Sequence, residues 1–232
     1  MAQSKRIRNF LKNNEIQNQY TLEQAVNLIK EYSKTSSVKF AESVDAQVVL
    51  GVDPTKGDQV VKSTVSLPNG TGRTVRVIVF AEGDDIQKAI AAGATHAGND
   101  DLIDKVKNGF MDFDKCIATS GMMKKLVPLA KILGPRGLMP NPKLGTVTDD
   151  VAGTVKAFIS GRLEYRTGKD PIVRVSVGRT SFEAEKIIEN VKALINSIKQ
   201  AKPATVKGQY IVMLRLSATM SGFNLKIPVS MI

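Results

Sequence analysis

The chain contains one cysteine, one histidine and no tryptophan among its 232 residues. A single cysteine, Cys116, excludes an internal disulfide and a multi-cysteine metal site, as expected for a reducing compartment. Its apolar neighbours predict that Cys116 is a small buried core residue. Because His96 is the only imidazole, a site that needs two histidines is excluded, and we expect a structural role for His96.

Long apolar runs are also missing. None approaches the roughly 20 residues that cross a bilayer, and the amino terminus lacks the apolar stretch of a secretion signal. We therefore expect a cytosolic protein with no membrane partner. The first fourteen residues carry basic groups and no acid, which predicts a flexible basic arm, and an organellar transit peptide is the alternative.

Motifs of nucleotide-binding enzymes are absent as well. The glycines of 70–72 precede a predicted strand, whereas a dinucleotide loop follows a strand and opens a helix. The loop at 134–137 lacks the Lys-Ser/Thr of a P-loop. Three acidic pairs (84–85, 100–101 and 149–150) come just before predicted helices, so helix capping explains them better than metal binding. We expect no catalytic residue, no metal and no cofactor.

Positive charge is the strongest signal that is present: 33 Lys and Arg stand against 22 Asp and Glu. Residues 160–232 carry 12 basic and 5 acidic groups, whereas the segments 1–68 and 69–159 each have a net charge of +2. A nucleic acid is the natural partner, because cations that neutralise phosphates release counterions. The alternative is a basic protein that uses its charge only for solubility.

The spacing of apolar residues changes character twice along the chain. The outer parts predict amphipathic helices and antiparallel strands. The helices are one at 21–34, with a capping box of Thr21 and Gln24, and a long one that starts at Ser181. The strands are at 44–52, 59–67, 163–166, 172–177 and 210–216. The middle alternates strictly between strands and helices, at 74–80, 85–92, 96–97, 101–108, 115–118 and 122–133, and a helix from Val151 follows. We predict an α/β protein in which a split α+β domain is interrupted by an inserted parallel α/β domain.

Three segments suit RNA. Lys39–Ser43 offers a cation for phosphate, the ring of Phe40 for a base or ribose, and short hydrogen-bonding groups for 2′-hydroxyls, although Phe40 could instead be a core residue where a strand begins. In Arg162–Lys169, the residues 166–169 form an exposed polar turn that joins the strands at 163–166 and 172–177, although a solvated hairpin would look much the same. The small residues of Leu216–Gly222 would let backbone groups approach RNA closely, although ordinary loops share this composition.

Several longer motifs carry a resemblance to a known family. They are KFAESVDAQVVLGVD (39–53), LPNGTGR (67–73), LGPRGLMPNPKLGTVT (133–148), Tyr165-Arg166 with Lys169, AKPATVKGQYI (201–211) and Ser217-Ala218-Thr219-Met220. Over nearly its whole length the chain resembles the family of the bacterial-type ribosomal large-subunit protein L-one, which forms the mobile stalk beside the tRNA exit site. The family has Thr-Met-Gly where this chain has Thr219-Met220-Ser221, and the tail 223–232 is unlike the family.

The resemblance implies the fold and the partners. It implies an rRNA-binding domain of residues 1–68 and 160–232, interrupted at 69–159 by a Rossmann-like three-layer α/β domain. The partners would be the stalk of a 23S-type rRNA, the leader of the chain's own messenger RNA, whose translation it would repress, and the exit-site tRNA, whose release it would aid. The protein would be a monomer outside a bacterial or organellar ribosome.

The resemblance also implies which residues contact RNA. They are Lys39, Phe40, Glu42, Ser43, Arg166, Thr167, Gly168, Lys169, Thr219, Met220 and Ser221. Two other functions remain open. A nucleotide-dependent enzyme could use the inserted α/β domain, and a messenger-RNA repressor could act free of the ribosome.

Overall fold

The computed structural model describes residues 7–8, 10, 19–35 and 38–231, and the chain forms two compact units. Unit 1 combines Met1–Gly72 with Leu163–Ile232, and unit 2 is Arg73–Arg162. The basic arm predicted for residues 1–14 lies mostly outside the described residues. We describe each unit by itself.

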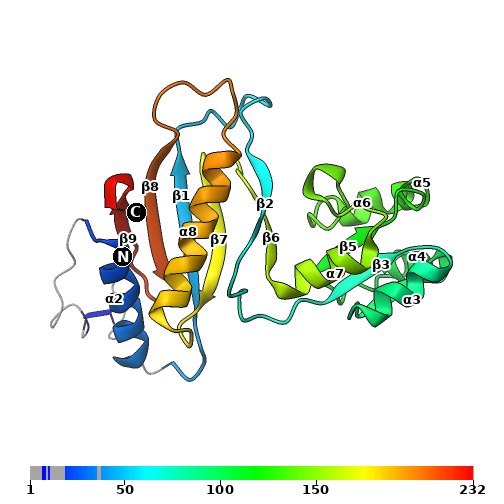
Figure 1. Cartoon of the computed structure of the whole chain (residues 1–232), viewed down its shortest axis with the longest axis horizontal. Coiled ribbons are helices and arrows are strands. Elements are labelled where there is room, and N and C mark those ends of the chain that lie inside the picture. Colours follow the sequence, from blue (N-terminus) through cyan, green and yellow to red (C-terminus); the bar gives the residue numbers. More distant parts are fainter. Residues whose placement is uncertain (1–6, 9, 11–18, 36–37, 232) are drawn as a thin grey trace. The chain divides into compact units, whose positions relative to one another are not determined.

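Unit 1 is built on a four-stranded antiparallel sheet in the order β7-β1-β8-β9 (Figure 1). The strands are β1 (Ser43–Leu50), β7 (Ile172–Arg179), β8 (Ile211–Ala218) and β9 (Leu225–Pro228). Every second residue of β1 is buried, as the alternating sequence predicts for a strand with one face on the core. Strand β9 lies in the tail that is unlike the family, and its Leu225 and Ile227 are fully buried.

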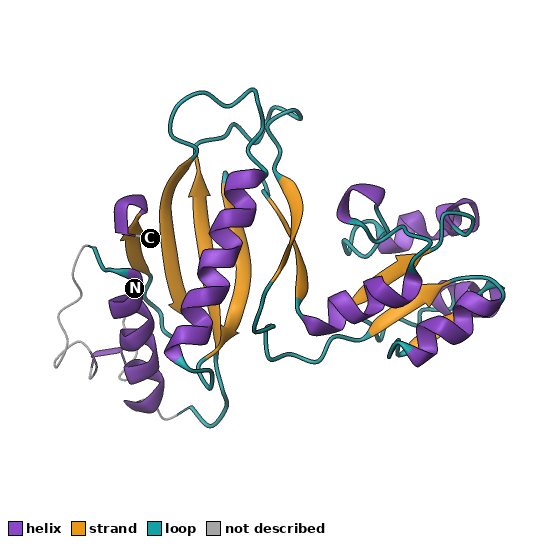
Figure 2. Cartoon of the chain, in the orientation of Figure 1, coloured by secondary structure: helices purple, strands orange, loops and turns teal. Residues whose placement is uncertain are grey.

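Two helices, α2 (Leu22–Thr35) and α8 (Ala184–Gln200), cover the core face of this sheet (Figure 2). The predicted capping box is confirmed: the Thr21 N–H donates to Gln24 Oε1 at 3.1 Å, and the Gln24 N–H donates to Thr21 Oγ1 at 3.3 Å. The predicted start of the long helix at Ser181 is wrong, because a turn holds this segment. The Phe182 N–H donates to the Arg179 carbonyl at 3.0 Å, and the helix begins after Glu183.

A second, two-stranded sheet pairs β2 (Lys62–Ser66) with β6 (Arg162–Arg166). The expectation that β6 and β7 form one hairpin is therefore wrong, since β7 pairs with β1 and only a single bridge joins Thr167 to Val173. Thr167 instead bonds to Val61, through a backbone bond of 2.9 Å and a bond of 3.2 Å from the Val61 N–H to the Thr167 hydroxyl. Strand pairing depends on these distant partners, which the local sequence does not reveal.

Unit 2 has a three-stranded parallel sheet in the order β4-β3-β5, with helices on both faces (Figure 1). All four residues of β3 are buried, as the continuous β-branched run predicts. The elements of the unit are β3 (Val77–Phe80), α3 (Asp84–Ala91), β4 (His96–Gly98), α4 (Asp100–Lys107), β5 (Lys115–Ala118), α5 (Met123–Leu126), η1 (Val127–Leu129), α6 (Ala130–Leu133), η2 (Pro142–Leu144) and α7 (Val151–Ser160).

The helix predicted at 122–133 is divided into α5, the 3₁₀ turn η1 and α6. Pro128 lies within η1 and lacks the N–H that an α-helix would need there, so the chain tightens into a 3₁₀ turn. Leu126, Leu129 and Leu133 still face the core. None of the described helices is long and apolar enough to cross a membrane.

Candidate nucleic-acid interface

Two of the three predicted RNA segments meet at one end of the unit 1 sheet. The Ser43 N–H donates to the Thr219 hydroxyl at 3.1 Å, and the Thr219 N–H donates to the Ser43 carbonyl at 3.1 Å. These bonds join the start of β1 to the end of β8. Residues 39–43 and 219–221 therefore form one surface, which we call the loop cluster.

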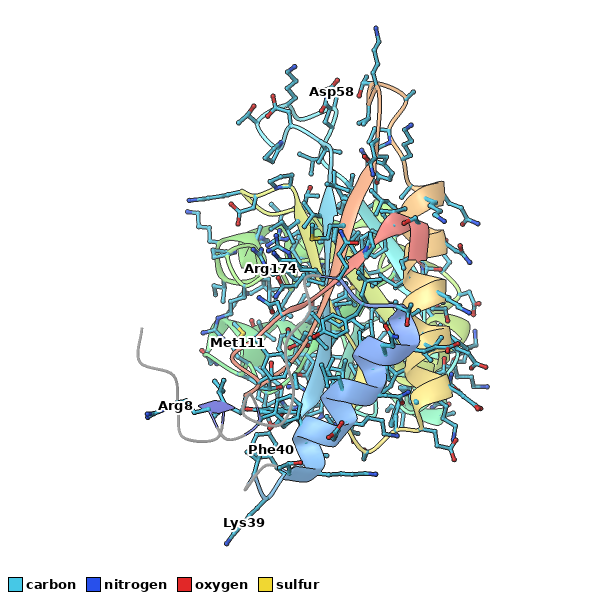
Figure 3. All side chains as sticks on the ribbon, turned by 90° about the vertical axis from the view of Figure 1, so that its left-hand side faces the viewer. Arg8, Lys39, Phe40, Asp58, Met111 and Arg174 are labelled. Atoms are coloured by element: carbon cyan, nitrogen blue, oxygen red, sulfur yellow. The ribbon has the colours of Figure 1, made fainter. Side chains whose placement is uncertain are left out.

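The loop cluster exposes two large apolar side chains beside a cation. Phe40 is 56% exposed and Met220 is 54% exposed, and Lys39 is exposed as well. Figure 3 shows Lys39 and Phe40 projecting from this end of unit 1. The alternative that Phe40 is a core residue is thus wrong. An exposed ring and thioether next to a cation can contact the bases, the riboses and the phosphates of one nucleic acid.

A hydrogen-bonded turn holds Met220 in its exposed position. The Ser221 N–H donates to the Ala218 carbonyl at 3.1 Å, and the Ser221 hydroxyl accepts from the Ala218 N–H at 3.2 Å. From α2, the hydroxyl of Tyr32 donates to the Met220 carbonyl at 3.1 Å. The backbone on both sides of Met220 is therefore fixed, while its side chain is left outside.

Gly222 follows Ser221, one position after the glycine of the family's Thr-Met-Gly motif, and its backbone conformation requires a glycine. Gly222 has a φ of 65°, a conformation that favours glycine, whereas no described residue other than glycine has a positive φ. A side chain at this position would also collide with Ile7. The turn thus uses Ser221 for its hydrogen bonds and Gly222 for the change of chain direction.

Three of the predicted contact residues are buried. Glu42 is 0%, Ser221 1% and Thr167 5% exposed. Their side chains are covered in this structure, and contact of RNA with them stays a prediction. Ser221 and Thr167 are instead bonded to neighbouring backbone groups, so they position the exposed residues beside them.

The remaining predicted segment lies at the other end of the same sheet. Arg166, Gly168 and Lys169 are exposed just before β7, whose first residues pair with the end of β1: Ile172 lies opposite Val49, while Arg179 lies opposite Ser43. The two ends of β1 are separated by seven steps of about 3.4 Å, or roughly 24 Å. The predicted site is therefore divided into two parts.

The face of the sheet that points away from the core connects the two parts. We call it the outer face. It carries the alternate residues of β1 with their cross-strand partners, namely Ser43, Asp45, Gln47 and Val49 of β1, Ile172, Arg174 and Ser176 of β7, Met213, Arg215 and Ser217 of β8, and Lys226 and Pro228 of β9.

A transverse row of cations crosses the middle of the outer face. Gln47 lies opposite Arg174 on one side and Arg215 on the other, and Arg215 lies opposite Lys226. With strands about 4.8 Å apart, the row is roughly 14 Å wide. In Figure 3, Arg174 lies between the end that carries Lys39 and the opposite end of unit 1. Arg174 also forms an ion pair with Asp170 at 3.2 Å, whereas Arg215 and Lys226 are direct cross-strand neighbours of like charge. Like charges opposite each other repel, so a polyanion that lies across these two cations relieves the repulsion.

Sequence reasoning did not single out this row, because its members are spread over four strands. The only acid between the two ends on β1 is Asp45. Burial raises the pKa of Asp45 above its ordinary value, and a hydrogen bond with the Ser176 side chain acts in the opposite direction. The signal that could have revealed the row is the register of the strands, which the sequence does not give.

Unit 2 offers little for catalysis. Cys116 is buried, and burial raises the pKa of its thiol far above the ordinary range, which makes it unreactive. His96 is exposed and packs edge-to-face on Phe110. Asp150 caps α7 by accepting from the Gly153 N–H at 3.0 Å, and the other two acidic pairs lie in the first turns of α3 and α4.

The carboxyl edge of the parallel sheet, where nucleotides bind in related architectures, is occupied by an ion cluster. Lys125 Nζ lies 2.9 Å from Glu82 Oε1 and 3.4 Å from Asp100 Oδ1, so it ties together the loops that follow β3 and β4. No group of three or more potential metal ligands occurs among the described residues.

Comparison with known proteins places the chain in a family. The model of the ribosomal protein L1p/L10e family matches residues 29–222. A protein of Legionella pneumophila (strain Corby) named large ribosomal subunit protein uL1 is 50% identical over 228 residues, which cover 98% of this chain and 96% of that protein. A protein of the same name from Protochlamydia amoebophila (strain UWE25) is 45% identical, over 97% of this chain and 93% of that protein. Another, from Chlamydia pneumoniae, is 44% identical, over 93% of this chain and 92% of that protein. The relatives carry the name of a protein of the large ribosomal subunit. The resemblance found in the sequence is confirmed, and the chain belongs to the ribosomal protein L1p/L10e family.

Proposed function

We propose that this chain is a structural constituent of the large ribosomal subunit and binds the stalk of a 23S-type rRNA through the outer face of unit 1. One observation carries the proposal. The loop cluster with its exposed Lys39 and the exposed basic segment 166–169 lie at opposite ends of a single sheet face, and a row of three cations crosses that face between them. The names of the relatives support the ribosomal assignment.

The geometry fits a folded RNA better than a short single strand. The distance of roughly 24 Å between the two parts spans several nucleotides of a helical RNA, since one strand advances about 3.4 Å per charge in a comparable duplex. The central cations would contact phosphates and supply salt-sensitive affinity. Phe40 and Met220 at one end would supply the close fit to bases or riboses that distinguishes one RNA fold from another.

The same proposal gives each unit its role. Unit 1 would be the rRNA-binding domain, and unit 2 would be an independent Rossmann-like domain inserted between β2 and β6. The surface that holds the rRNA stalk would also accept a similar fold in the leader of the chain's own messenger RNA, which would repress its translation. Release of deacylated tRNA would follow from the position of the protein at the stalk, and outside the ribosome the chain would be a monomer.

The experiment is a titration of the full chain with an rRNA stalk fragment across a salt series. We expect tight binding that weakens as salt rises. Phe40→Ala should weaken binding by about 1–3 kcal/mol without changing the salt dependence, because stacking does not release counterions. Ile90→Ala removes an equally exposed apolar side chain, at 56%, from unit 2 and serves as the matched control.

Two outcomes would contradict the proposal. Binding that is absent or independent of salt would remove the nucleic-acid function. Tight binding of a nucleotide without binding of the stalk fragment would favour the enzyme alternative. Sedimentation with large subunits distinguishes a ribosomal constituent from a free messenger-RNA repressor, because only the constituent would travel with the subunits.

A further inference from the structure

The turn that exposes Met220 is connected to three aromatic rings that pack on one another, those of Phe10, Tyr32 and Phe223. The Tyr32 ring meets Phe10 edge-to-face, with centroids 5.1 Å apart, and meets Phe223 in the same way at 4.9 Å. The rings of Phe10 and Phe223 are nearly parallel, at 4°, with centroids 5.8 Å apart. Aromatic pairs favour such arrangements. We call these three residues the aromatic cluster.

The members of the aromatic cluster come from three distant parts of the chain. Phe10 belongs to the amino-terminal segment and is 3% exposed, and Tyr32 belongs to α2 and is 1% exposed. Phe223 follows the turn and packs against the core of unit 1. The amino-terminal segment makes a second contact there, because the side chain of Ile7 lies against Gly222. Figure 3 shows Arg8 at the same end of unit 1 as Phe40.

Two hydrogen bonds connect the aromatic cluster to the backbone of the turn. The Tyr32 hydroxyl donates to the Met220 carbonyl at 3.1 Å, and the Ser221 hydroxyl donates to the Phe223 carbonyl at 3.0 Å. The direction of the Tyr32 hydroxyl depends on the position of its ring, which Phe10 and Phe223 both contact. Removal of Phe10 would therefore loosen the bond that holds the Met220 carbonyl.

We infer that Phe10 and Tyr32 are positioning residues for RNA binding, through which the amino-terminal segment holds the turn of Thr219 and Met220 in its binding conformation. The inference rests on the proposed function, since it requires that the loop cluster binds RNA. A turn that is already held in this conformation loses less entropy when RNA binds. The apparent affinity falls in proportion to the fraction of molecules in which the turn is held.

The alternative is that the aromatic cluster only stabilises unit 1. In that case a substitution would lower the free energy of unfolding without changing the RNA affinity of the molecules that remain folded. The bond from Tyr32 to Met220 favours the positioning role, because Met220 is 54% exposed and lies outside the core.

The first test titrates the full chain with the rRNA stalk fragment at a fixed salt concentration, after urea unfolding has shown that each variant is folded. Tyr32→Phe keeps the ring and removes only the hydroxyl that holds the Met220 carbonyl. It should weaken binding by about threefold, because a hydrogen bond of ordinary net strength is lost from the binding conformation. Tyr210→Phe is the matched control: it also removes the hydroxyl of a buried tyrosine of unit 1, but beside the opposite end of β8, and should leave the affinity unchanged.

The second test removes the contact from the amino-terminal segment. Phe10→Ala should weaken binding by about tenfold, because the turn then spends most of its time outside the binding conformation. Ile211→Ala is the matched control, since it shortens another buried apolar side chain of unit 1, at the start of β8. It should lower the stability of the chain and leave the affinity of the folded molecules unchanged.

The third test repeats Phe10→Ala in a chain that already carries Met220→Ala. There it should weaken binding by less than about threefold, because residues that act through each other are not additive. The same loss in both backgrounds would overturn the inference, since Phe10 would then act independently of Met220. Parent-like affinity of Tyr32→Phe would also overturn it and would leave the proposed function intact. Absence of binding by the parent chain would instead overturn the proposed function and, with it, the inference.

Discussion

At the scale of single residues, Tyr210 combines burial with an unpaired polar group. Its side chain is 7% exposed, and among the described residues its hydroxyl has no hydrogen-bond partner. Burial raises the pKa of Tyr210 to about 12, and the neighbouring Tyr165 acts in the same direction. The folded chain therefore disfavours the tyrosinate relative to the unfolded chain.

This shift predicts an alkaline loss of stability that depends on one hydroxyl. Above its ordinary pKa of 10.0, the unfolded phenol releases a proton that the folded one keeps, so stability falls as the pH rises from about 10 toward 12. In Tyr210→Phe this part of the loss should disappear. Near neutral pH the variant should be at least as stable as the parent, because it buries no unpaired hydroxyl.

Urea unfolding followed by circular dichroism at a neutral and an alkaline pH checks this prediction. Tyr165→Phe is the matched control, since the Tyr165 hydroxyl lies 3.0 Å from the Ser197 hydroxyl, and its removal should cost about 0.5–1.5 kcal/mol at neutral pH. If Tyr210→Phe proved less stable than the parent at neutral pH, the Tyr210 hydroxyl would have a hydrogen-bond partner in solution, and the prediction would be wrong.

Residue types alone predicted which segments suit RNA but not which side chains are accessible. Lys39, Phe40 and Met220 are exposed, whereas Glu42 and Ser221 in the same segments are buried. A polar residue in a motif can either contact a ligand or hold the loop that does so. Only the packing around it decides between these roles.

At the scale of elements, Asn190 interrupts the apolar face of α8 and is fully buried. Its amide donates to the carbonyls of Gly70 at 2.9 Å and Val177 at 2.8 Å, and its oxygen accepts from the Asn69 N–H at 3.1 Å. One side chain thus connects α8, β7 and the turn by which the chain leaves unit 1. The helical pattern predicted the helix but gave no reason for this residue.

Asn190→Ala should destabilise unit 1 by about 3 kcal/mol, because three backbone groups lose their partner and each stranded buried group costs about 1–3 kcal/mol. All four tyrosines (20, 32, 165 and 210) lie in unit 1, so urea unfolding followed by tyrosine fluorescence reports on this unit alone. Lys192→Ala, at an exposed position of the same helix, should change stability by less than about 0.5 kcal/mol. A similar small effect for Asn190→Ala would mean that water replaces its hydrogen bonds.

Local patterns located most elements, since they depend on neighbouring residues. The continuous run at β3 and the capping box of α2 were both sufficient. The same patterns failed for strand pairing, where β6 joins β2 instead of β7, and for the helix at 122–133, where Pro128 lies within a 3₁₀ turn that divides the helix.

At the scale of the whole molecule, the chain leaves unit 1 after β2 and returns through β6, and these two strands pair with each other. The strands that bound the insertion are therefore held within unit 1. The core of unit 1 comes from residues on both sides of unit 2, whereas the two cores of unit 2 come from its own residues alone.

Replacement of residues 73–162 by a short glycine-rich linker should leave unit 1 folded, because its core loses no member and a short loop costs little entropy. Tyrosine fluorescence should show a cooperative urea transition as in the full chain. Affinity for the rRNA stalk fragment should change by less than about tenfold, or 1.4 kcal/mol. Loss of cooperative unfolding would show that unit 1 depends on unit 2 for its stability.

The sequence by itself determined the family, the excess of positive charge, the insertion of one segment into another and the position of most helices and strands, because these depend on composition and on neighbouring residues. Only the tertiary structure decided that two of the segments predicted to contact RNA meet at one end of a sheet while the third lies at the other, and that Arg174, Arg215 and Lys226 form a row between them. The physical reason is strand register: hydrogen bonds between distant strands set which side chains become neighbours, and no local pattern encodes that choice.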